Sequence, residues 1–413
     1  MKKPLVILIL MLCLCSQAIG QNPLGFSLLK KNQQVELSFQ NESNLIVIPI
    51  ILNSKGPYNF ILDTGSESGM IFDKWVIGEN NLVDARTVPI YSGDGNKITD
   101  LLVANDVKIQ FKGVQGEKQS MLVFQENDLD IKNALGVQAI GVLGSEIFNR
   151  FIVEVNYEKE SIRLYEPSQF KVPKGFKKVD IEIRDLRPFV EVKVKQKGQK
   201  ATKINLLIDT GASSALFLDA ENNENIIVPE KNIQHTIGSG LTGNIVGKVG
   251  RVDKVQIESF KFKKVVASYP ENWRIKKEVK GEDGSLIRYG TIGSDMLSRF
   301  TVIYDYFNEV MYLKKNNTYK DAFKFNTMGL RIIAKGDDLD QYFINEIIPN
   351  SPASAIDFMV GDEIIALNGR PVFFYKYSEI NTILRAEPRT RTTIIIRRND
   401  ELIKKVVKHK KLI

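Results

Sequence analysis

The chain of 413 residues contains only two cysteines and two histidines. Both cysteines, Cys13 and Cys15, lie in an apolar N-terminal segment, so a chain that has lost this segment would form no disulfide. Neither His235 nor His409 stands in a pattern with serine, cysteine or carboxylate that suits a catalytic triad or a zinc site, and we expect both at the surface. The sequence therefore predicts neither a metal nor a cofactor.

The N-terminal segment 1–20 has the features of a secretory signal peptide. Met1-Lys2-Lys3 is a short basic opening, the segment 5–14 is almost wholly apolar, and Ala18-Ile19-Gly20 places small residues before a cleavage site. Lipidation at Cys15 is the alternative, against which the bulky Leu14 argues. No later run of 18 or more apolar residues follows, so we expect no transmembrane span. The sequence predicts an exported protein, periplasmic or extracellular.

The charge of the chain is moderately basic. The formal net charge is +8, and +6 without Lys2 and Lys3, with much of the excess between Arg389 and Lys411. A solvated basic strand and tail explains this excess better than a nucleic-acid-binding surface does, because an exported protein has little reason to bind nucleic acid. We expect no nucleic-acid partner. About 390 residues remain after cleavage, enough for two or three globular domains.

Two copies of one short motif stand out. Asp63-Thr64-Gly65 follows the apolar segment 60–62, and Asp209-Thr210-Gly211 follows the apolar segment 206–208 in the second half of the chain. Chance alone would place one such tripeptide in about one chain in ten of this length. A duplicated frame, with an apolar strand before each copy and an apolar cluster after it, indicates a site built from both copies.

A pair of carboxylates has a specific chemistry. Two carboxylates a few ångströms apart cannot both ionise cheaply, so they share a proton and their titrations separate. One then serves as a base and the other as an acid. Glycine after each Asp-Thr pair lets the two turns approach each other because no Cβ intervenes. Asp63 and Asp209 are therefore the predicted catalytic residues.

A second marker follows each acid at nearly the same spacing. It is Val142-Leu143-Gly144-Ser145 after Asp63 and Thr291-Ile292-Gly293-Ser294 after Asp209. Over about residues 34–316, these paired motifs resemble the pepsin and retropepsin superfamily of aspartic proteases. The resemblance implies a polypeptide substrate and a water molecule held between the two carboxylates.

The same resemblance implies roles for the residues around the two acids. Thr64 and Thr210 are expected to lock the turns together, with Gly65 and Gly211 beside them. Ser66 could donate a hydrogen bond to Asp63, whereas Ala212 offers no such group to Asp209.

A glycine-rich stretch lies between each acid and its second marker. Tyr91 and Gly93 belong to the first stretch and Gly240 to the second, and the two stretches follow their acids at similar separations along the chain. Both stretches are candidate hairpin tips. In the superfamily such hairpins are flaps that close over the bound peptide, although a plain surface hairpin is the alternative. Tyr91, Gly93 and Gly240 are the flap candidates.

The composition changes after Asn316. Residues 327–332, 344–353 and 360–369 resemble, in order, the motifs of a PDZ domain of the bacterial envelope type. The resemblance implies that the loop before Leu330 offers amides to a terminal carboxylate and that the next strand receives a peptide. Asp357 departs from the family pattern, which usually has glycine there, so we expect a different local turn. The predicted groove comprises Met328, Gly329, Leu330, Ile332, Ile380 and Leu384, of which Ile380 and Leu384 could equally be core residues.

The sequence thus predicts a mainly β chain with two pseudo-symmetric acid-protease lobes and a C-terminal PDZ domain. The expected divisions are a signal peptide at 1–20, lobes at 21–170 and 171–318, and the PDZ domain at 319–413. The expected activity is that of an aspartic endopeptidase, with the PDZ domain recruiting substrate or regulating cleavage. The alternative is a non-catalytic peptide-binding protein that uses the same cleft and groove.

Overall fold

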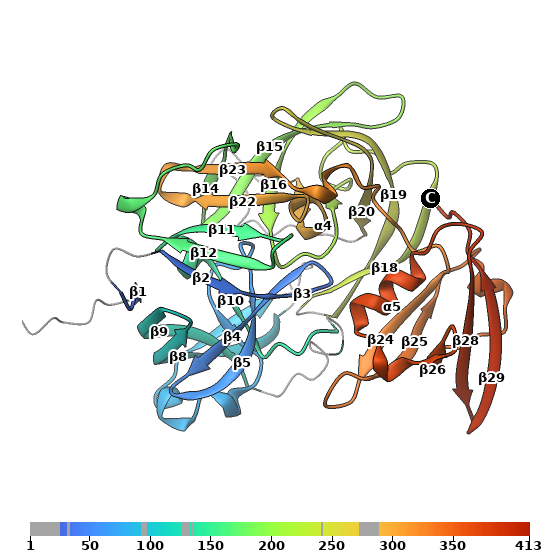
Figure 1. Ribbon diagram of the computed structural model, residues 1–413, viewed down its shortest axis with the longest axis horizontal. Helices are drawn as coiled ribbons and strands as arrows, with labels where there is room; N and C mark the ends of the chain where they lie inside the picture. The colour runs from blue at the N-terminus through green and yellow to red at the C-terminus, as the bar shows by residue number, and fades with distance from the viewer. Residues whose placement is uncertain are drawn as a thin grey trace, which may run out of the picture.

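The structure is a computed structural model that describes residues 25–30, 34–91, 97–125, 133, 136–240, 243–271 and 289–413 (Figure 1). The predicted signal peptide and the flap candidate Gly93 lie outside these residues. In the part of the chain that is described, no helix combines the length and the hydrophobicity needed to cross a bilayer.

The first Asp-Thr-Gly turn belongs to a nine-stranded sheet in the order β1-β9-β6-β10-β5-β4-β8-β7, with β3 paired to β4. Strand β4 is rich in β-branched residues and is mostly buried, which suits a central strand. The strands are β1 (Gly25–Leu28), β3 (Gln40–Glu42), β4 (Leu45–Leu52), β5 (Lys55–Leu62), β6 (Met70–Ile71), β7 (Thr87–Tyr91), β8 (Lys97–Phe111), β9 (Val114–Phe124) and β10 (Gly141–Leu143). The short 3₁₀ helices η1 (Lys74–Val76) and η2 (Glu79–Leu82) follow β6.

The second turn belongs to a sheet of similar construction, ordered β14-β15-β16-β21-β17-β20-β19-β18. In both sheets the strand that leads to the acid pairs in parallel with the strand of the second marker, β5 with β10 and β16 with β21. The strands are β14 (Glu182–Arg184), β15 (Arg187–Lys195), β16 (Thr202–Asp209), β17 (Leu216–Leu218), β18 (Asn232–Gly240), β19 (Gly243–Ile257), β20 (Phe260–Pro270) and β21 (Gly290–Gly293).

A third sheet joins the two halves. Its order is β13-β23-β22-β11-β12-β2, and the central pair β11 and β22 brings one strand from each repeat together, with Val153 opposite Tyr304. The relative position of the halves therefore rests on backbone hydrogen bonds as well as packing. The elements are β2 (Val35–Ser38), β11 (Ile152–Asn156), β12 (Ser161–Tyr165), β13 (Lys177–Asp180), β22 (Phe300–Asp305), β23 (Val310–Lys315), α3 (Ser145–Phe148), α4 (Ser294–Leu297), η3 (Pro167–Gln169), η5 (Tyr306–Asn308) and η6 (Asn317–Lys320).

The C-terminal module has its own sheet, β24-β25-β26-β28-β29 with β27 on β26, and its own buried core. Figure 1 shows helix α5 on the side of this module that faces the other sheets. Its elements are β24 (Leu330–Lys335), β25 (Gln341–Ile347), β26 (Glu363–Leu367), β27 (Arg370–Pro371), β28 (Arg391–Arg398), β29 (Glu401–Lys408), α5 (Tyr377–Leu384), η7 (Ala353–Ala355) and η8 (Val372–Phe374). The predicted mainly β class is confirmed.

The two histidines are not the surface residues that the sequence predicts. His409 is 2% exposed, with Thr327 Oγ1 2.8 Å from its Nδ1 and Thr392 Oγ1 2.9 Å from its Nε2. The two hydroxyls satisfy both ring nitrogens, so the ring can be buried without losing hydrogen bonds. His235 is half-buried, and its ring centre lies 5.7 Å from that of Phe325. Both expectations fail because tertiary packing covers the rings.

The departure from the PDZ pattern has a clear local structure. Asp357 accepts a hydrogen bond from Arg398 at 3.1 Å and pairs with Lys405 at 3.3 Å. An ion-pair network thus stands where the family usually has glycine.

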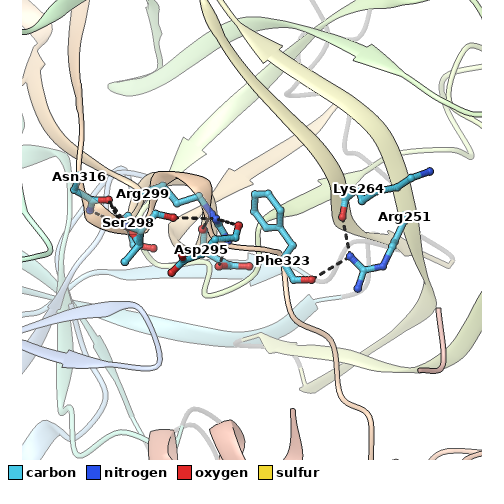
Figure 2. Close-up of polar contacts among 9 residues, drawn as sticks. Arg251, Lys264, Asp295, Ser298, Arg299, Asn316 and Phe323 are labelled. Carbon is cyan, nitrogen blue, oxygen red and sulfur yellow. Dashed lines mark hydrogen bonds and ion pairs between the residues drawn. The ribbon is translucent and has the colours of Figure 1, made fainter. Parts of the chain in front are cut away.

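The segment between η6 and the module is pinned to the second sheet (Figure 2). The guanidinium of Arg299 lies 3.6 Å from the centre of the Phe323 ring and donates to the carbonyl of Asp321. Arg251 donates to the carbonyl of Phe323 at 3.0 Å. Phe323 itself is buried at 4% exposure and packs edge-on against Phe262. The segment that connects η6 to the module is therefore packed against the second half. We call this segment the strap, and its contacts fix the position of the module.

This strap yields a prediction for Phe323→Ala. The substitution removes the ring that Arg299 and Phe262 contact, which should cost about 3 kcal/mol locally and release the strap. Limited proteolysis should then cut within residues 317–326 at least several times faster than in the unchanged chain. Phe373→Ala supplies the control, because Phe373 is 61% exposed. Equal proteolysis rates for both variants would show that the strap is held by other contacts.

Candidate active site

The two Asp-Thr-Gly turns touch through a reciprocal set of hydrogen bonds. Thr64 Oγ1 donates to the carbonyl of Ile208 at 2.7 Å and accepts from the amide of Thr210 at 3.0 Å. Thr210 Oγ1 donates to the carbonyl of Leu62 at 2.8 Å and accepts from the amide of Thr64 at 3.0 Å. Both threonines are 0% exposed. Each hydroxyl thus satisfies two backbone groups of the opposite half that would otherwise be buried without a partner.

The glycine of each turn lies against the acid of the other. A Cβ on Gly65 would lie 2.7 Å from Cγ of Asp209, and one on Gly211 would lie 2.5 Å from Cγ of Asp63. Non-bonded carbon atoms do not approach each other so closely, so these positions require glycine for space. The amides also contribute: Gly65 donates to Asp63 Oδ1 at 2.7 Å, and Gly211 donates to Oδ1 of both Asp209 and Asp63 at 2.9 and 3.1 Å.

The structure therefore places Asp63 and Asp209 side by side at the floor of one cavity, where both remain partly exposed. Burial by the surrounding atoms, followed by the negative charge of Asp209, raises the pKa of Asp63 well above its usual range. The amides of Gly65 and Gly211 oppose this rise. A carboxyl group that keeps its proton beside an ionised neighbour is the arrangement that acid–base work by a pair requires.

The second markers form backbone hydrogen bonds with the residues that follow each Asp-Thr-Gly turn. The amide of Ser145 donates to the carbonyl of Ser66 at 3.0 Å, and the amide of Ser294 donates to the carbonyl of Ala212 at 2.7 Å. The hydrogen bond expected from Ser66 to Asp63 is absent: Ser66 Oγ donates to the carbonyl of Ser68 at 2.8 Å. That acceptor lies further along the same turn and satisfies the hydroxyl locally.

Sequence reasoning missed an acidic residue that directly follows each marker serine. Glu146 accepts from the amide of Gly144 at 3.1 Å, and its other oxygen is buried with no hydrogen-bond partner in the described structure. Burial raises the pKa of Glu146 to about 7. Burial also raises the pKa of Asp295, while the charge of Arg299 opposes the change. Glu146 and Asp295 stand at equivalent positions of the two repeats, and this repetition in the sequence could have identified them.

The cavity above the two aspartates has a volume of about 710 Å³ and extends to the C-terminal module. One wall is the hairpin β18–β19, in which Gly240 pairs with Gly243 beside the tip. Ile237 and Gly238 of this hairpin line the cavity. In the first half, Tyr91 ends β7 and pairs with Lys97 of β8. Paired strands thus flank both glycine-rich stretches, whose tips lie outside the described residues, and their action as flaps stays a prediction.

The side chains of the predicted PDZ groove are mostly buried in the module, and two of them, Leu330 and Leu384, also border the cavity above the two aspartates. Met328, Leu330, Ile332, Ile380 and Leu384 are at most 2% exposed and form part of the module's core. Asn326 Oδ1 accepts from the amides of Met328 and Gly329 at 3.1 and 2.7 Å, so its side chain sits where a terminal carboxylate was expected. A peptide would have to displace it, and peptide binding there stays a prediction.

Comparison with known families agrees with this architecture. Residues 190–296 match the family model described as aspartyl protease, a span that includes the second Asp-Thr-Gly and its marker. Residues 343–398 match the model described as PDZ domain. No curated protein matches the chain. The protein thus combines an aspartyl protease domain with a PDZ domain on a mainly β fold.

The contact between turns yields a prediction for Gly211→Ala. The added methyl group would overlap Asp63, so the turns must separate, at a cost of about 3 kcal/mol in the free energy of unfolding. Gly238→Ala is the matched control, because its Cβ would meet nothing closer than 3.7 Å. Denaturant unfolding of both variants measures the difference. A Gly211→Ala variant as stable as the control would mean that the turns do not need this contact.

Glu146 yields a pH-dependent prediction. Its pKa is about 7 in the folded chain against 4.5 in the reference state, so the stability that its protonated form contributes is complete below 4.5 and is lost as pH rises through 7. The loss amounts to at most about 3 kcal/mol. Relative to the unchanged chain, Glu146→Gln should gain stability between about pH 4 and about pH 8.

Unfolding free energies of both proteins across this pH range check the expectation. Glu79→Gln, at an exposed position on η2, controls for the loss of one negative charge. A constant difference between Glu146→Gln and the unchanged chain over the whole range would contradict the assignment.

Proposed function

We propose that the protein is an aspartic endopeptidase that hydrolyses polypeptides with Asp63 and Asp209 as its catalytic pair. The observation that supports this most is the reciprocal contact of two Asp-Thr-Gly turns, which sets the carboxyl groups together at the floor of an open cavity. The aspartyl protease match over residues 190–296 points to the same class of hydrolase.

The proposed reaction needs no covalent intermediate with the protein. The ionised carboxylate of the pair takes a proton from a water molecule, which attacks the carbonyl carbon of the peptide bond, and the protonated partner donates to the carbonyl oxygen as the tetrahedral intermediate forms. The intermediate then collapses: the C–N bond breaks, the amine nitrogen takes the proton that came from water, and the new hydroxyl group returns its proton to the other carboxylate. Burial and the neighbouring charge raise the pKa of Asp63, so the pair can hold one proton, and the amides of Gly65 and Gly211 orient both carboxylates.

A non-catalytic peptide-binding protein is the weaker alternative. Such a protein would need a cleft, but it would need neither a pair of acids nor the two glycines that bring them within contact of each other. A carboxylate pair with one raised pKa costs stability, because one member is forced to hold a proton in a buried site. Acid–base catalysis by the pair explains why the protein keeps an arrangement that lowers its stability.

We further propose two protease lobes at 21–170 and 171–318 and a PDZ domain at 319–413 that orients polypeptide at the cleft. The similar order of strands in the two large sheets supports the division into lobes. The docked strap and the cavity that reaches the C-terminal module support a role for that module next to the cleft.

The proposal predicts that Asp63→Asn and Asp209→Asn each abolish cleavage of a peptide library, lowering kcat/KM by about a thousandfold or more. Either acid alone lacks the partner that supplies the complementary proton transfer. A peptide with a hydroxyl group in place of the scissile carbonyl should inhibit the unchanged protein because it mimics the tetrahedral intermediate. Cleavage products are measured by mass spectrometry.

Folding must be controlled in the same experiment. Both Asn variants should be at least as resistant to denaturant as the unchanged chain, since Asn preserves the shape of Asp and removes one carboxylate from the pair. Asp253→Asn, on the distant part of β19, serves as the control for activity. Cleavage retained by Asp63→Asn or by Asp209→Asn would overturn the mechanism. If the unchanged protein cleaved no peptide, the non-catalytic peptide-binding alternative would be favoured.

A further inference from the structure

Helix α5 of the PDZ module presents two different faces. Ile380 and Leu384 are buried in the module's core. The opposite, polar face lines the cavity that holds Asp63 and Asp209, as do Tyr377 and Leu384 of the same helix. We call this face, with the residue that follows the helix, the α5 wall: it consists of Ser378, Asn381, Thr382 and Arg385, all of which line that cavity.

The usual peptide-binding edge of the module, by contrast, is satisfied by the chain's own side chains. Asn326 bonds the amides of Met328 and Gly329, and its Nδ2 donates to the carbonyl of Leu330 at 2.7 Å. Further along β24, the hydroxyl of Tyr377 donates to the carbonyl of Ile332 at 3.0 Å. Leu330 and Leu384 of the groove also border the cavity, but a strand added to β24 would need these same carbonyls and would have to break both hydrogen bonds.

Contacts with both halves of the protease region hold the α5 wall in place. Glu346 on β25 accepts from the amide of Thr236 on the β18–β19 hairpin, with both oxygens at 3.2 Å. On the other half, Lys376 pairs with Glu42 at 3.2 Å. Together with the strap shown in Figure 2, these contacts make the module a fixed side of the cleft.

The charge of this side is positive. Among the cavity-lining residues between positions 324 and 385, three are cations and none is a carboxylate; the cations are Lys324, Arg331 and Arg385. Arg385 is exposed on the α5 wall, and its charge acts on Asp295 at the same cavity, partly opposing the rise in the pKa of that carboxyl. A polypeptide that lies over Asp63 and Asp209 therefore meets a cationic, hydrogen-bonding surface on the PDZ side.

We propose that the α5 wall is a specificity-determining surface, which selects polypeptides with an acidic side chain near the bond to be cleaved. Arg385 supplies the positive charge, and the side chains of Ser378 and Asn381 supply hydrogen bonds. The PDZ module then acts on substrate choice through the polar face of its helix and without a strand added to β24. This inference rests on the proposed peptidase activity.

The test uses the full chain and a set of peptides that differ only in one residue, which is Glu, Gln or Lys at each position around a common cleavage site. The unchanged protein should favour Glu over Lys by about tenfold in kcat/KM at one or more positions on one side of the cleaved bond, and added salt should weaken the preference. Arg385→Gln should remove most of this preference, and Arg385→Glu should reverse it.

The peptide with Gln is the uncharged reference substrate for the unchanged protein and for both variants. Because this substrate has no charge at the varied position, the preference of each variant is expressed as the ratio of kcat/KM for the Glu peptide to kcat/KM for the Gln peptide, so that a change affecting all peptides cancels. Arg391→Glu is the matched control, since it makes the same charge change at an exposed position outside the cavity. It should leave the preference for Glu unchanged.

The two proposals fail in different ways. If no peptide is cleaved, or if cleavage survives in Asp63→Asn, the proposed activity is wrong. If Gln peptides are cleaved but Glu and Lys peptides are cleaved equally well, the inference about the α5 wall is overturned. The same holds if the preference persists in Arg385→Glu, or if Arg391→Glu reduces it as much.

Discussion

The contact between the two Asp-Thr-Gly turns is the constraint on which the rest of the structure depends. Four hydrogen bonds between Thr64, Thr210 and the adjoining backbone cross from one half to the other in a fully buried place. If one hydroxyl were removed while the halves stayed together, its two backbone partners would be buried without hydrogen bonds, at a cost of about 1–3 kcal/mol for each group. The halves therefore stabilise each other at the point where the carboxylates lie.

The same contact creates an electrostatic cost. It places Asp63 and Asp209 close together in partial burial, which raises the pKa of Asp63, and the amides of the two glycines offset only part of the penalty. Glu146 adds a further buried carboxyl group behind the first turn. The surrounding sheets must hold these groups against their tendency to separate, and the shared sheet through β11 and β22 does so by backbone pairing.

The C-terminal module turns toward the cavity a face other than the strand edge at which peptide binding was expected. Its core and strand order would allow a peptide-binding groove, yet Asn326 and Tyr377 satisfy the groove's backbone groups. The contact between Phe323 and Arg299 fixes the strap to the second half. With the module held there, the polar face of α5 lines the cavity. Since the strap is buried against the second half, the orientation of the module depends on packing outside the module itself.

Much of the candidate site could be predicted from the sequence, because the information is local and duplicated. An apolar strand followed by Asp-Thr-Gly specifies a strand, a tight turn and a position for the acid in each repeat, and the repetition at Asp209 indicates that the two turns belong together. The mainly β class and the separate C-terminal module follow from the same short-range patterns.

Contacts between residues far apart in the chain, and the local choices that depend on them, were decided only by the tertiary structure. His409 became buried between Thr327 and Thr392, which stand 82 and 17 residues away in the chain, and Glu346 met the amide of Thr236, 110 residues away. Ser66 and Asn326 found partners within three residues of themselves, a choice among local groups that the sequence leaves open. The position of Arg385 beside the cavity of Asp63 is of the same kind. Sequence periodicity shows which face of a helix is polar, but which surface that face meets depends on the packing of whole domains.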